Sequence, residues 1–586
     1  MEKIGGFCQL VTRLFICFIF ITPVLAQDGP VRLLLEGATI IDGISDTPLR
    51  GYSILVEDNL IREILPPGES ADGDLERIDL EGKYIIPGLI DSHVHWLDWM
   101  GELYVNHGVT SVIALANLDK SMRTSSQTSH GLPRLFHSGN RPPFNKDTTQ
   151  REMRQVINDW LENEPDIAHF PTHNETISRA YALAAKEVQR HGYKVFGHAE
   201  NVPNSTRDGH GIIEHIWGFT QAVMSEDELA AFQRGDYLTW ATFMTDRWDE
   251  IDKIIRDVVE QGIYLNPTLV YEWGGMSRDA NQREIDDYLT LRDPDLVYFP
   301  DNIKLSLFAK HRQIKNFSTR YGNLPMVNKL PEADRHEFET GFENIKEFMR
   351  RWMAAGGKVQ AGTDAITAGV PGLILHQEMR ILVETGLTPM QAIKSVTRWS
   401  AEKLEGIDGK RGEAKVGSIE PRKYADLVVL DKNPLVDIYH TRSISRVMKD
   451  GKWVELGYHP EYYTFTRPSR AIAGSTFAPV ISTVLPSYVV AGGEERRIAL
   501  EGSGFQMTTL VRVNGISVKT EFINPRRVEF DLPASLFARA TPDPYSSPGP
   551  YQGSNIVGFR GIEIHAFNPP PEGGVSNTIN LMVRPR

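Results

Sequence analysis

The chain has 586 residues, with an apolar fraction of 41% and a charged fraction of 24%. This length exceeds what a single hydrophobic core supports, so we expect several domains. The net charge of −13 argues against a nucleic-acid partner, because nucleic-acid binding requires a basic surface.

Residues 1–26 have the features of a cleaved export signal. Lys3 and Arg13 form a basic start, 14–26 is a short apolar run, and small residues precede Gln27. A membrane anchor is the alternative, but the run is too short to cross hydrocarbon and Arg13 interrupts any extension. We therefore expect a periplasmic or secreted protein.

Both cysteines, Cys8 and Cys17, lie inside this signal. The mature chain would then have no disulfide and no thiolate metal site, although it enters an oxidising compartment. Any metal ion must be held by histidine, carboxylate or lysine groups.

The secondary structure that the sequence predicts changes along the chain. Residues 31–64 are typical of short strands with turns, and the same texture returns at 425–454. Between them, apolar strand-like runs alternate with amphipathic segments, which predicts βα units and a parallel sheet. A charged and aromatic insertion at 271–336 is either a lid or wall at the active site or a helical decoration far from it. Beyond Pro468, strand-like pieces alternate with Gly/Pro turns, as in a small β-sandwich.

One helix has clear boundaries. Thr388 is a good N-cap, Pro389 suits the first helical position, and Gln391 completes a capping box. The apolar pattern predicts that this helix continues to about Gly406.

An apolar strand at 85–92 leads into His93 and His95. On a strand, residues i and i+2 face the same side, so the two imidazoles point together and form half of a metal site. Alone, this His-x-His pair is weak evidence, because polar residues commonly end strands.

The motif PGLIDSHVH at 87–95 resembles the first-strand signature of the amidohydrolase superfamily. Further segments match that family in order: 106–112 resembles its second strand, 193–200 its fifth, 211–215 its sixth, 359–365 its eighth, and 417–430 the return to an accessory β-domain. The resemblance covers about 31–456, and the subgroup it most resembles contains imidazolonepropionase-like and prolidase-like members.

The resemblance implies a (β/α)₈ barrel with an accessory β-sandwich built from both flanks. The expected organisation is a signal peptide at 1–26, an accessory β-domain from 27–86 and 412–460, the barrel at 87–411, a linker at 461–477, and a C-terminal all-β sandwich at 478–586. The last of these resembles the IPT/TIG group of immunoglobulin-like domains, on Gly502-Ser503-Gly504-Phe505 and Val513-Asn514-Gly515 among others. We expect it to bind a protein or glycan partner or to act as a spacer, and an oligomer remains open.

The matching positions give a candidate site at the carboxyl ends of the barrel strands. The candidate metal ligands are His93, His95, His198, His215 and Asp364. Imidazoles suit Zn²⁺ or a similar divalent ion. Asp364 can also take a proton from the metal-bound water and return one to the leaving group, so it is the catalytic candidate.

Three positions depart from the family pattern or stay open. Where many relatives have a carboxylated lysine on the fourth strand, this chain has His169, which cannot become a carbamate. We therefore favour one metal ion over two, with His169 either a direct ligand or a substrate or core contact.

Residues 201–209 are expected to be a loop, and His210 is the alternative to His215 as the candidate metal ligand of the sixth strand. His376 is a candidate substrate contact or neighbour of the site, although a solvent-facing position is equally expected.

The leading functional hypothesis is an exported hydrolase that cleaves a C–N bond in an amide, cyclic amide or dipeptide-like substrate. The same activated water attacks esters, so an esterase or lactonase is the second hypothesis. The third is a metal-free binding protein that has the fold of an enzyme without its activity. The departure from the family pattern at His169 and the additional C-terminal sandwich are compatible with this hypothesis. The fold does not determine the substrate.

Overall fold

The computed structural model describes residues 32–584 with gaps; the described ranges are 32–115, 118, 120–129, 131–234, 237–293, 295–296, 298–299, 332–365, 369–459, 462, 479–514, 516–537, 562–568, 574–577 and 579–584. The expected export signal, both cysteines and almost all of the expected linker lie outside the described residues. Within the described ranges, no helix is both long enough and apolar enough to cross a bilayer.

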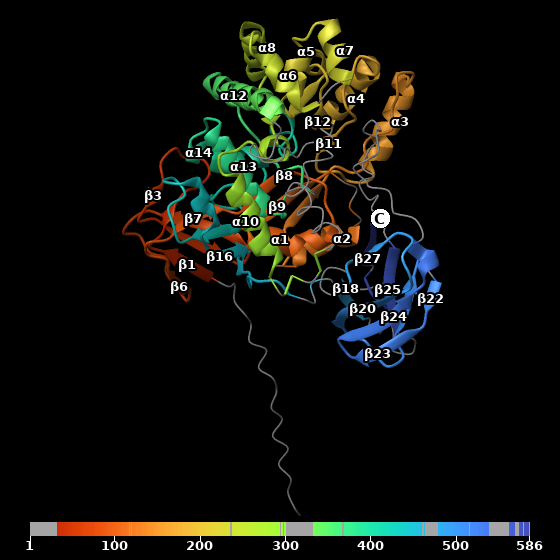
Figure 1. Ribbon diagram of the computed structural model, residues 1–586. Helices are drawn as coiled ribbons and strands as arrows, with labels where there is room; N and C mark the ends of the chain where they lie inside the picture. The colour runs from red at the N-terminus through yellow and green to blue at the C-terminus, as the bar shows by residue number, and fades with distance from the viewer. Residues whose placement is uncertain are drawn as a thin grey trace, which may run out of the picture.

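The first β-region combines strands from both ends of the central region (Figure 1). Its strands are β1 (Arg32–Glu36), β2 (Thr39–Ile40), β3 (Leu49–Arg50), β4 (Ser53–Glu57), β5 (Leu60–Leu65), β6 (Glu76–Asp79), β7 (Tyr84–Pro87), β15 (Leu427–Leu430), β16 (Ile444–Lys449) and β17 (Lys452–Trp453). They form two sheets, ordered β5-β4-β1-β6 and β17-β16-β15-β7-β2-β3. In the second sheet β15 pairs antiparallel with β7, which places Val428 opposite Ile86. One hydrophobic cluster, including Val56, Ile85 and Met448, joins the two sheets.

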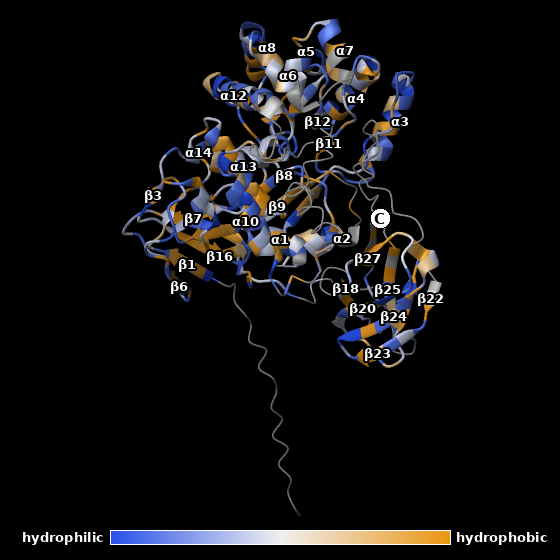
Figure 2. Ribbon diagram, viewed as in Figure 1, coloured by the Kyte–Doolittle hydropathy of each residue, from blue (hydrophilic) through white to orange (hydrophobic). Residues whose placement is uncertain are grey.

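The central region contains two parallel sheets, ordered β10-β9-β8 and β11-β12-β13-β14. Their strands are β8 (Leu89–Val94), β9 (Val109–Ala114), β10 (Arg134–His137), β11 (Ala168–His169), β12 (Val195–His198), β13 (His210–Glu214) and β14 (Tyr264–Asn266). Every residue of β8 and β9 is buried. Continuous burial is expected for parallel strands that are covered on both faces, and Figure 2 shows β9 coloured as apolar.

Backbone contacts extend beyond these two sheets. Leu265 forms a parallel bridge with Val359, and Val94 forms one with Ala365, so residues 359–365 lie between β14 and β8. At the other edge, the Asp166 amide donates to the His137 carbonyl at 2.8 Å. The paired strands of the described chain do not form a single closed sheet.

Helices connect and surround these strands. They are α1 (Gly101–Asn106), α2 (Lys120–Thr128), α3 (Gln150–Leu161), α4 (Ser178–Arg190), α5 (Val202–Arg207), α6 (Trp217–Gln221), α7 (Glu226–Arg234), α8 (Trp248–Glu260), α9 (Leu269–Trp273), α10 (Ala280–Leu291), α12 (Glu332–Ala354), α13 (Leu373–Glu384), α14 (Pro389–Ser395) and α15 (Arg398–Ala401), with short 3₁₀ segments η1 (Asp98–Met100), η2 (Tyr237–Met244), η4 (Ile407–Gly409) and η5 (Ile438–Arg442). In α8 the buried residues Ile251, Ile255 and Val258 are spaced for one helical face. This amphipathic spacing explains why α8 packs on the core through one side.

Two local predictions need correction. Residues 201–209 are not a loop, because Asn201 caps α5 by accepting from the Asn204 amide and Pro203 occupies the first turn. The predicted helix from Thr388 to Gly406 has its capping box but is broken into α14 and α15, since Thr397 has non-helical angles (φ −135°, ψ −104°). Within the predicted insertion 271–336, the structure describes α10 and the end of α9, while 300–331 lies outside the described residues.

The described residues of the C-terminal region form strands and one 3₁₀ turn. It contains β18 (Val480–Leu485), β19 (Tyr488–Val490), β20 (Arg496–Ser503), β21 (Leu510–Val513), β22 (Ile516–Val518), β23 (Thr520–Asn524), β24 (Arg527–Leu532), η6 (Ala534–Phe537), β25 (Ile562–Asn568), β26 (Gly574–Val575) and β27 (Ile579–Arg584). Two sheets, β18-β20-β24-β23 and β19-β27-β25-β21-β22, share a hydrophobic cluster of their own. This region therefore has a core separate from that of the central region.

Candidate functional site

The carboxyl ends of the parallel strands bring the candidate histidines together. His93 lies near the end of β8, His169 ends β11 and His198 ends β12. His215 directly follows β13, and Asp364 lies in the segment that bridges β14 and β8. Strands that run in parallel end at one edge, so residues far apart in sequence meet there.

His93, His95 and Asp364 form the tightest group of the site. Their candidate ligand atoms all lie within 4.8 Å of one another. Asp364 Oδ1 is 3.3 Å from His93 Nε2 and 3.0 Å from His95 Nε2. Donors held about 2.0–2.2 Å from a tetrahedral zinc ion lie roughly 3.3 Å apart, so this donor set fits a divalent ion.

The structure adds Glu214, which the sequence analysis treated only as part of the sixth-strand pattern. Its side chain is fully buried among imidazoles: Oε1 lies 2.7 Å from His93 Nδ1, and Oε2 lies 3.4 Å from His198 Nε2 and 3.6 Å from His169 Nε2. Within the part of the chain that the structure describes, neither oxygen has a partner in hydrogen-bond geometry, and neither does His93 Nδ1. A buried carboxylate held only by such contacts needs a positive charge nearby.

His198 and His215 are oriented by threonine hydroxyls. The His215 Nδ1 atom is 2.6 Å from Thr268 Oγ1, and the His198 Nδ1 atom is 3.3 Å from Thr172 Oγ1. The two Nε2 atoms, one from each ring, are 3.1 Å apart. Two nitrogens at this distance either share one proton or face the same cation, so this pair also suits a metal ligand role.

His169 faces a guanidinium. Arg141 Nη2 lies 3.1 Å from His169 Nε2, and Arg141 Nε lies 3.4 Å from His169 Nδ1. Burial lowers the pKa of His169 to about 3, and the charge of Arg141 lowers it further. His169 is therefore neutral at physiological pH.

Charge in the site is concentrated on His93 and its two carboxylates. Burial alone would lower the pKa of His93, but Glu214 and Asp364 raise it to about 9. Burial opposes ionisation of Asp364, yet His93 and His95 hold the pKa of that carboxyl well below its usual range. The carboxylates therefore stay ionised and compensate a cation at this position.

Three residues of the site have left-handed backbone angles. His215 has φ of 59°, Thr268 has 45° and Asp364 has 50°. Such conformations disfavour side chains other than glycine, and they persist only where the surroundings enforce them. Their concentration at these strand ends indicates that the side-chain directions are imposed by the fold.

The other two histidine candidates are held elsewhere by both ring nitrogens. His210 contacts the Tyr181 hydroxyl at 2.7 Å and the Gly197 carbonyl at 2.9 Å. His376 contacts the Thr441 hydroxyl at 2.8 Å and the His107 carbonyl at 2.9 Å, and it is fully buried rather than solvent-facing. Of the competing pair His210 and His215, the structure brings His215 into the imidazole cluster.

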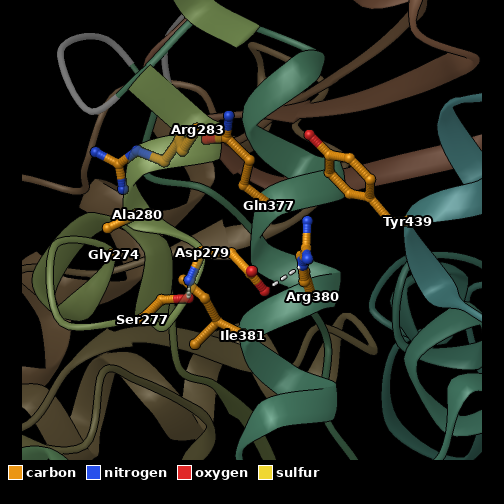
Figure 3. Close-up of a pocket in the computed structure, with 9 residues that line it drawn as sticks. All are labelled: Gly274, Ser277, Asp279, Ala280, Arg283, Gln377, Arg380, Ile381 and Tyr439. Carbon is orange, nitrogen blue, oxygen red and sulfur yellow. Dashed lines mark hydrogen bonds and ion pairs between the residues drawn. The ribbon is translucent and has the colours of Figure 1, made fainter. Parts of the chain in front are cut away.

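A different pocket lies between α10, α13 and η5 (Figure 3). Its lining residues are Gly274, Ser277, Asp279, Ala280, Arg283, Gln377, Arg380, Ile381 and Tyr439. Arg380 pairs with Asp279 at 2.6 Å and covers the Tyr439 ring at 4.2 Å. This pocket contains no member of the imidazole cluster, so the cluster remains the candidate site.

Comparison with known proteins gives similarities of three kinds. The sequence model of the amidohydrolase family matches residues 84–454. A dihydroorotase from Trichlorobacter lovleyi is 42% identical over 71 residues, which is 12% of this chain and 16% of that protein. A dihydroorotase from Geobacter metallireducens is 28% identical over 194 residues, which is 29% of this chain and 43% of that protein. The matches therefore span less than half the length of these curated relatives.

Solved structures show similarity over a longer part of the chain. A Xaa-Pro dipeptidase with bound methionine is 20% identical, with a TM-score of 0.48, and the match covers 72% of this chain and 100% of that one. A putative prolidase from Bifidobacterium longum is 20% identical, with a TM-score of 0.49, and the match covers 74% of this chain and 98% of that one.

Proposed function

The chain belongs to the amidohydrolase family, and from this premise we propose that it is a metal-dependent hydrolase of C–N bonds in amides, cyclic amides or dipeptide-like compounds. The observation that carries the proposal is the cluster of His93, His95 and Asp364, whose candidate ligand atoms lie within 4.8 Å of one another at the strand ends. Family membership makes hydrolysis the expected chemistry, and the cluster provides a place for the metal.

The proposed fold of the catalytic domain, at 87–411, is a (β/α)₈ barrel. The bridges from Leu265 to Val359 and from Val94 to Ala365 support it, because they place the segment 359–365 between the two parallel sheets. The accessory β-domain would comprise 27–86 and 412–460, supported by the pairing of β7 with β15.

We assign His93, His95, His198 and His215 as candidate ligands, with Asp364 as ligand and proton shuttle. A divalent ion held by these residues, with Zn²⁺ the first choice, would lower the pKa of a water molecule toward about 7 and would polarise the scissile carbonyl. Asp364 accepts a proton at a carboxylate oxygen and returns it to the leaving nitrogen. His95 and His198 are the more exposed members of the cluster, with side chains 19% and 12% exposed, so the substrate would approach from their side.

One ion per chain is the proposed stoichiometry. His169 cannot form the lysine carbamate that bridges two ions in many relatives, and Arg141 lies against it. No carbamate is then available at this position to bridge two dications, which repel strongly when they lie a few ångströms apart in a buried site.

Two measurements test this function. Elemental analysis of the purified mature protein should find about one divalent ion per chain, and a screen of N-acyl amino acids, dipeptides and lactones should find turnover with an amide. Turnover restricted to lactones would assign the site to ester hydrolysis. A protein without bound metal and without turnover would instead be a binding protein on a retired enzyme fold.

The remaining proposals concern the two ends of the chain. Export would be shown by mass spectrometry of the secreted or periplasmic protein, with an N-terminus near Gln27; retention of Met1 in a membrane fraction would contradict it.

We propose an IPT/TIG-like immunoglobulin fold for 478–586, supported by its two sheets around one apolar cluster. A glycan array and a pull-down with this region deleted would test its proposed glycan or protein partner.

A further inference from the structure

Arg141 brings a fixed positive charge to the edge of the imidazole cluster. It lies in the segment between β10 and α3, and its guanidinium contacts both ring nitrogens of His169 at 3.1 and 3.4 Å. A neutral imidazole has a single acceptor nitrogen, so it cannot satisfy the five donors of a guanidinium.

Among the residues that the structure describes, no carboxylate oxygen lies within 4.0 Å of a nitrogen of the Arg141 guanidinium, and both of its side-chain contacts are to His169. Its charge also reaches further into the site, because burial lowers the pKa of His198 well below its usual range and Arg141 is among the charges that lower it further. The half-buried guanidinium therefore keeps unused donors and an uncompensated charge beside the cluster.

Two consequences follow from this position. A second dication bound through His169 would lie beside a guanidinium, and like charges this close repel. An anionic oxygen of a ligand would instead find a planar set of donors suited to bidentate binding.

We propose that Arg141 supplies a fixed positive charge beside the proposed metal ion and binds the carboxylate of the substrate. The inference rests on the proposed hydrolase function and narrows it to substrates that carry a carboxylate near the scissile amide. His169 then acts as the support that positions the guanidinium, through the contacts at 3.1 and 3.4 Å.

The first test uses inorganic phosphate as an anionic probe and needs no turnover. Calorimetry on the metal-loaded full chain should show that Arg141→Met weakens phosphate binding by about 10- to 100-fold, the range for a charged hydrogen-bond partner, and that Arg141→Lys falls between. Lys146→Met is the matched control, because Lys146 is an exposed cation of the same segment, paired with Asp147 at 3.0 Å. Metal content should remain one ion per chain in every variant.

Unchanged phosphate affinity in Arg141→Met would overturn the proposal, and so would two tightly bound ions per chain in the wild type. Loss of metal in Arg141→Met would also overturn it, because Arg141 would then maintain the metal site rather than bind the anion. A wild type that binds phosphate through Arg141 but holds no metal or hydrolyses no amide would contradict the proposed function instead.

The second test separates the substrate carboxylate from the oxyanion that forms during hydrolysis. With an amide substrate found in the screen, Arg141→Met should raise KM for the acid form about 10-fold or more and raise KM for the neutral carboxamide analogue by a clearly smaller factor, because the amide oxygen accepts a hydrogen bond but carries no charge. An equal fall in kcat for both compounds would show that Arg141 stabilises the reacting carbonyl, and would contradict the carboxylate assignment.

Discussion

The two halves of the imidazole cluster are held by different chemistry. The carboxylate half comprises His93, His95 and Asp364, where nitrogens lie 3.0–3.3 Å from an ionised oxygen. The hydroxyl half comprises His198 and His215, whose Nδ1 atoms face threonine hydroxyls. Carboxylates compensate a cation, whereas hydroxyls orient neutral rings without adding charge. In the proposed metal site, the carboxylate half would therefore hold most of the charge of the ion, while the hydroxyl half would complete the ligand set and orient its rings.

Removing a ligand from the carboxylate half should have the largest effect. His95→Ala is expected to abolish metal binding and turnover together, because the variant deletes a donor that lies 3.0 Å from Asp364 Oδ1. Elemental analysis and activity measured on the same sample check this. His191→Ala, which removes an exposed histidine, is the control and should change neither. A His95→Ala protein with a full metal complement would reverse the ranking of the two halves.

Asp364→Asn should separate metal binding from proton transfer. An amide cannot accept the proton, so we expect turnover to fall by about 10²–10⁴-fold while much of the metal remains. Asparagine tolerates the left-handed backbone that Asp364 adopts, with φ of 50°, so the fold should be preserved. Metal content and kcat measured on the same sample distinguish the two roles of Asp364. Complete loss of the ion would show that Asp364 acts chiefly as a ligand.

The metal-free protein should depend on pH through the carboxylate half. Burial alone would lower the pKa of His93, but Glu214 and Asp364 raise it from 6.5 to about 9. The folded state therefore binds this proton more tightly than the unfolded state. The resulting stability, roughly 3 kcal/mol, is fully present below 6.5 and is lost as the pH rises through 9.

Urea unfolding in the presence of a chelator, at pH 6.5 and pH 9, measures this loss. Burial also lowers the pKa of Lys403 to about 7 and raises that of Glu378 to about 8, so the wild type and the variant both retain other groups that titrate in this range. The difference between the two proteins isolates His93: the midpoint of the wild type should fall relative to that of His93→Gln as the pH rises from 6.5 to 9. An equal change of midpoint in the two proteins would show that the two carboxylates do not hold a protonated His93.

Most residues of the cluster could be predicted from the sequence, whereas the contacts between their side chains could not. His93, His95, His198, His215 and Asp364 could be located because their segments resemble those of the amidohydrolase superfamily in order, and the structure places all five near the ends of parallel strands. Glu214 was passed over because the resemblance to the sixth strand of the family directs attention to His215, and Glu214 was treated only as part of that pattern. Both side chains reach the cluster because His215 has a left-handed backbone, with φ of 59°, which the sequence does not signal.

Arg141 and the two threonines were beyond sequence reasoning for a different reason. Thr172, Thr268 and Arg141 lie in loops, where no periodicity indicates the direction of a side chain. The missed helix α5 shows the same limit at the level of secondary structure. An Asn cap and a proline in the first turn begin it, but the same residue types also favour turns.

Glu214→Gln tests whether the carboxylate between the halves supports the metal. We expect metal affinity to fall about 10- to 100-fold, as for other groups that hold ligating histidines, because an amide carries no charge to compensate the ion. Competition with a chelator measures it, and Glu200→Gln, at an exposed glutamate just after β12, is the control. Unchanged affinity would mean that Glu214 serves packing rather than the metal.

The smallest expected effect compares the two threonines of the hydroxyl half. Valine keeps the shape and the β-branch of threonine and removes the hydroxyl, so backbone strain at Thr268 should be unchanged while His215 loses its partner at 2.6 Å. Thr268→Val should weaken metal binding about 10-fold, and Thr172→Val less, because its contact with His198 is longer, at 3.3 Å. Chelator competition on both variants measures which substitution weakens metal binding more.

If Thr172→Val had the larger effect, His198 rather than His215 would be the ring whose orientation limits metal binding, and the exposed side of the cluster would be the less preorganised one. If neither variant changed the affinity, the hydroxyl half would contribute little to holding the ion, and the metal would depend on the carboxylate half alone.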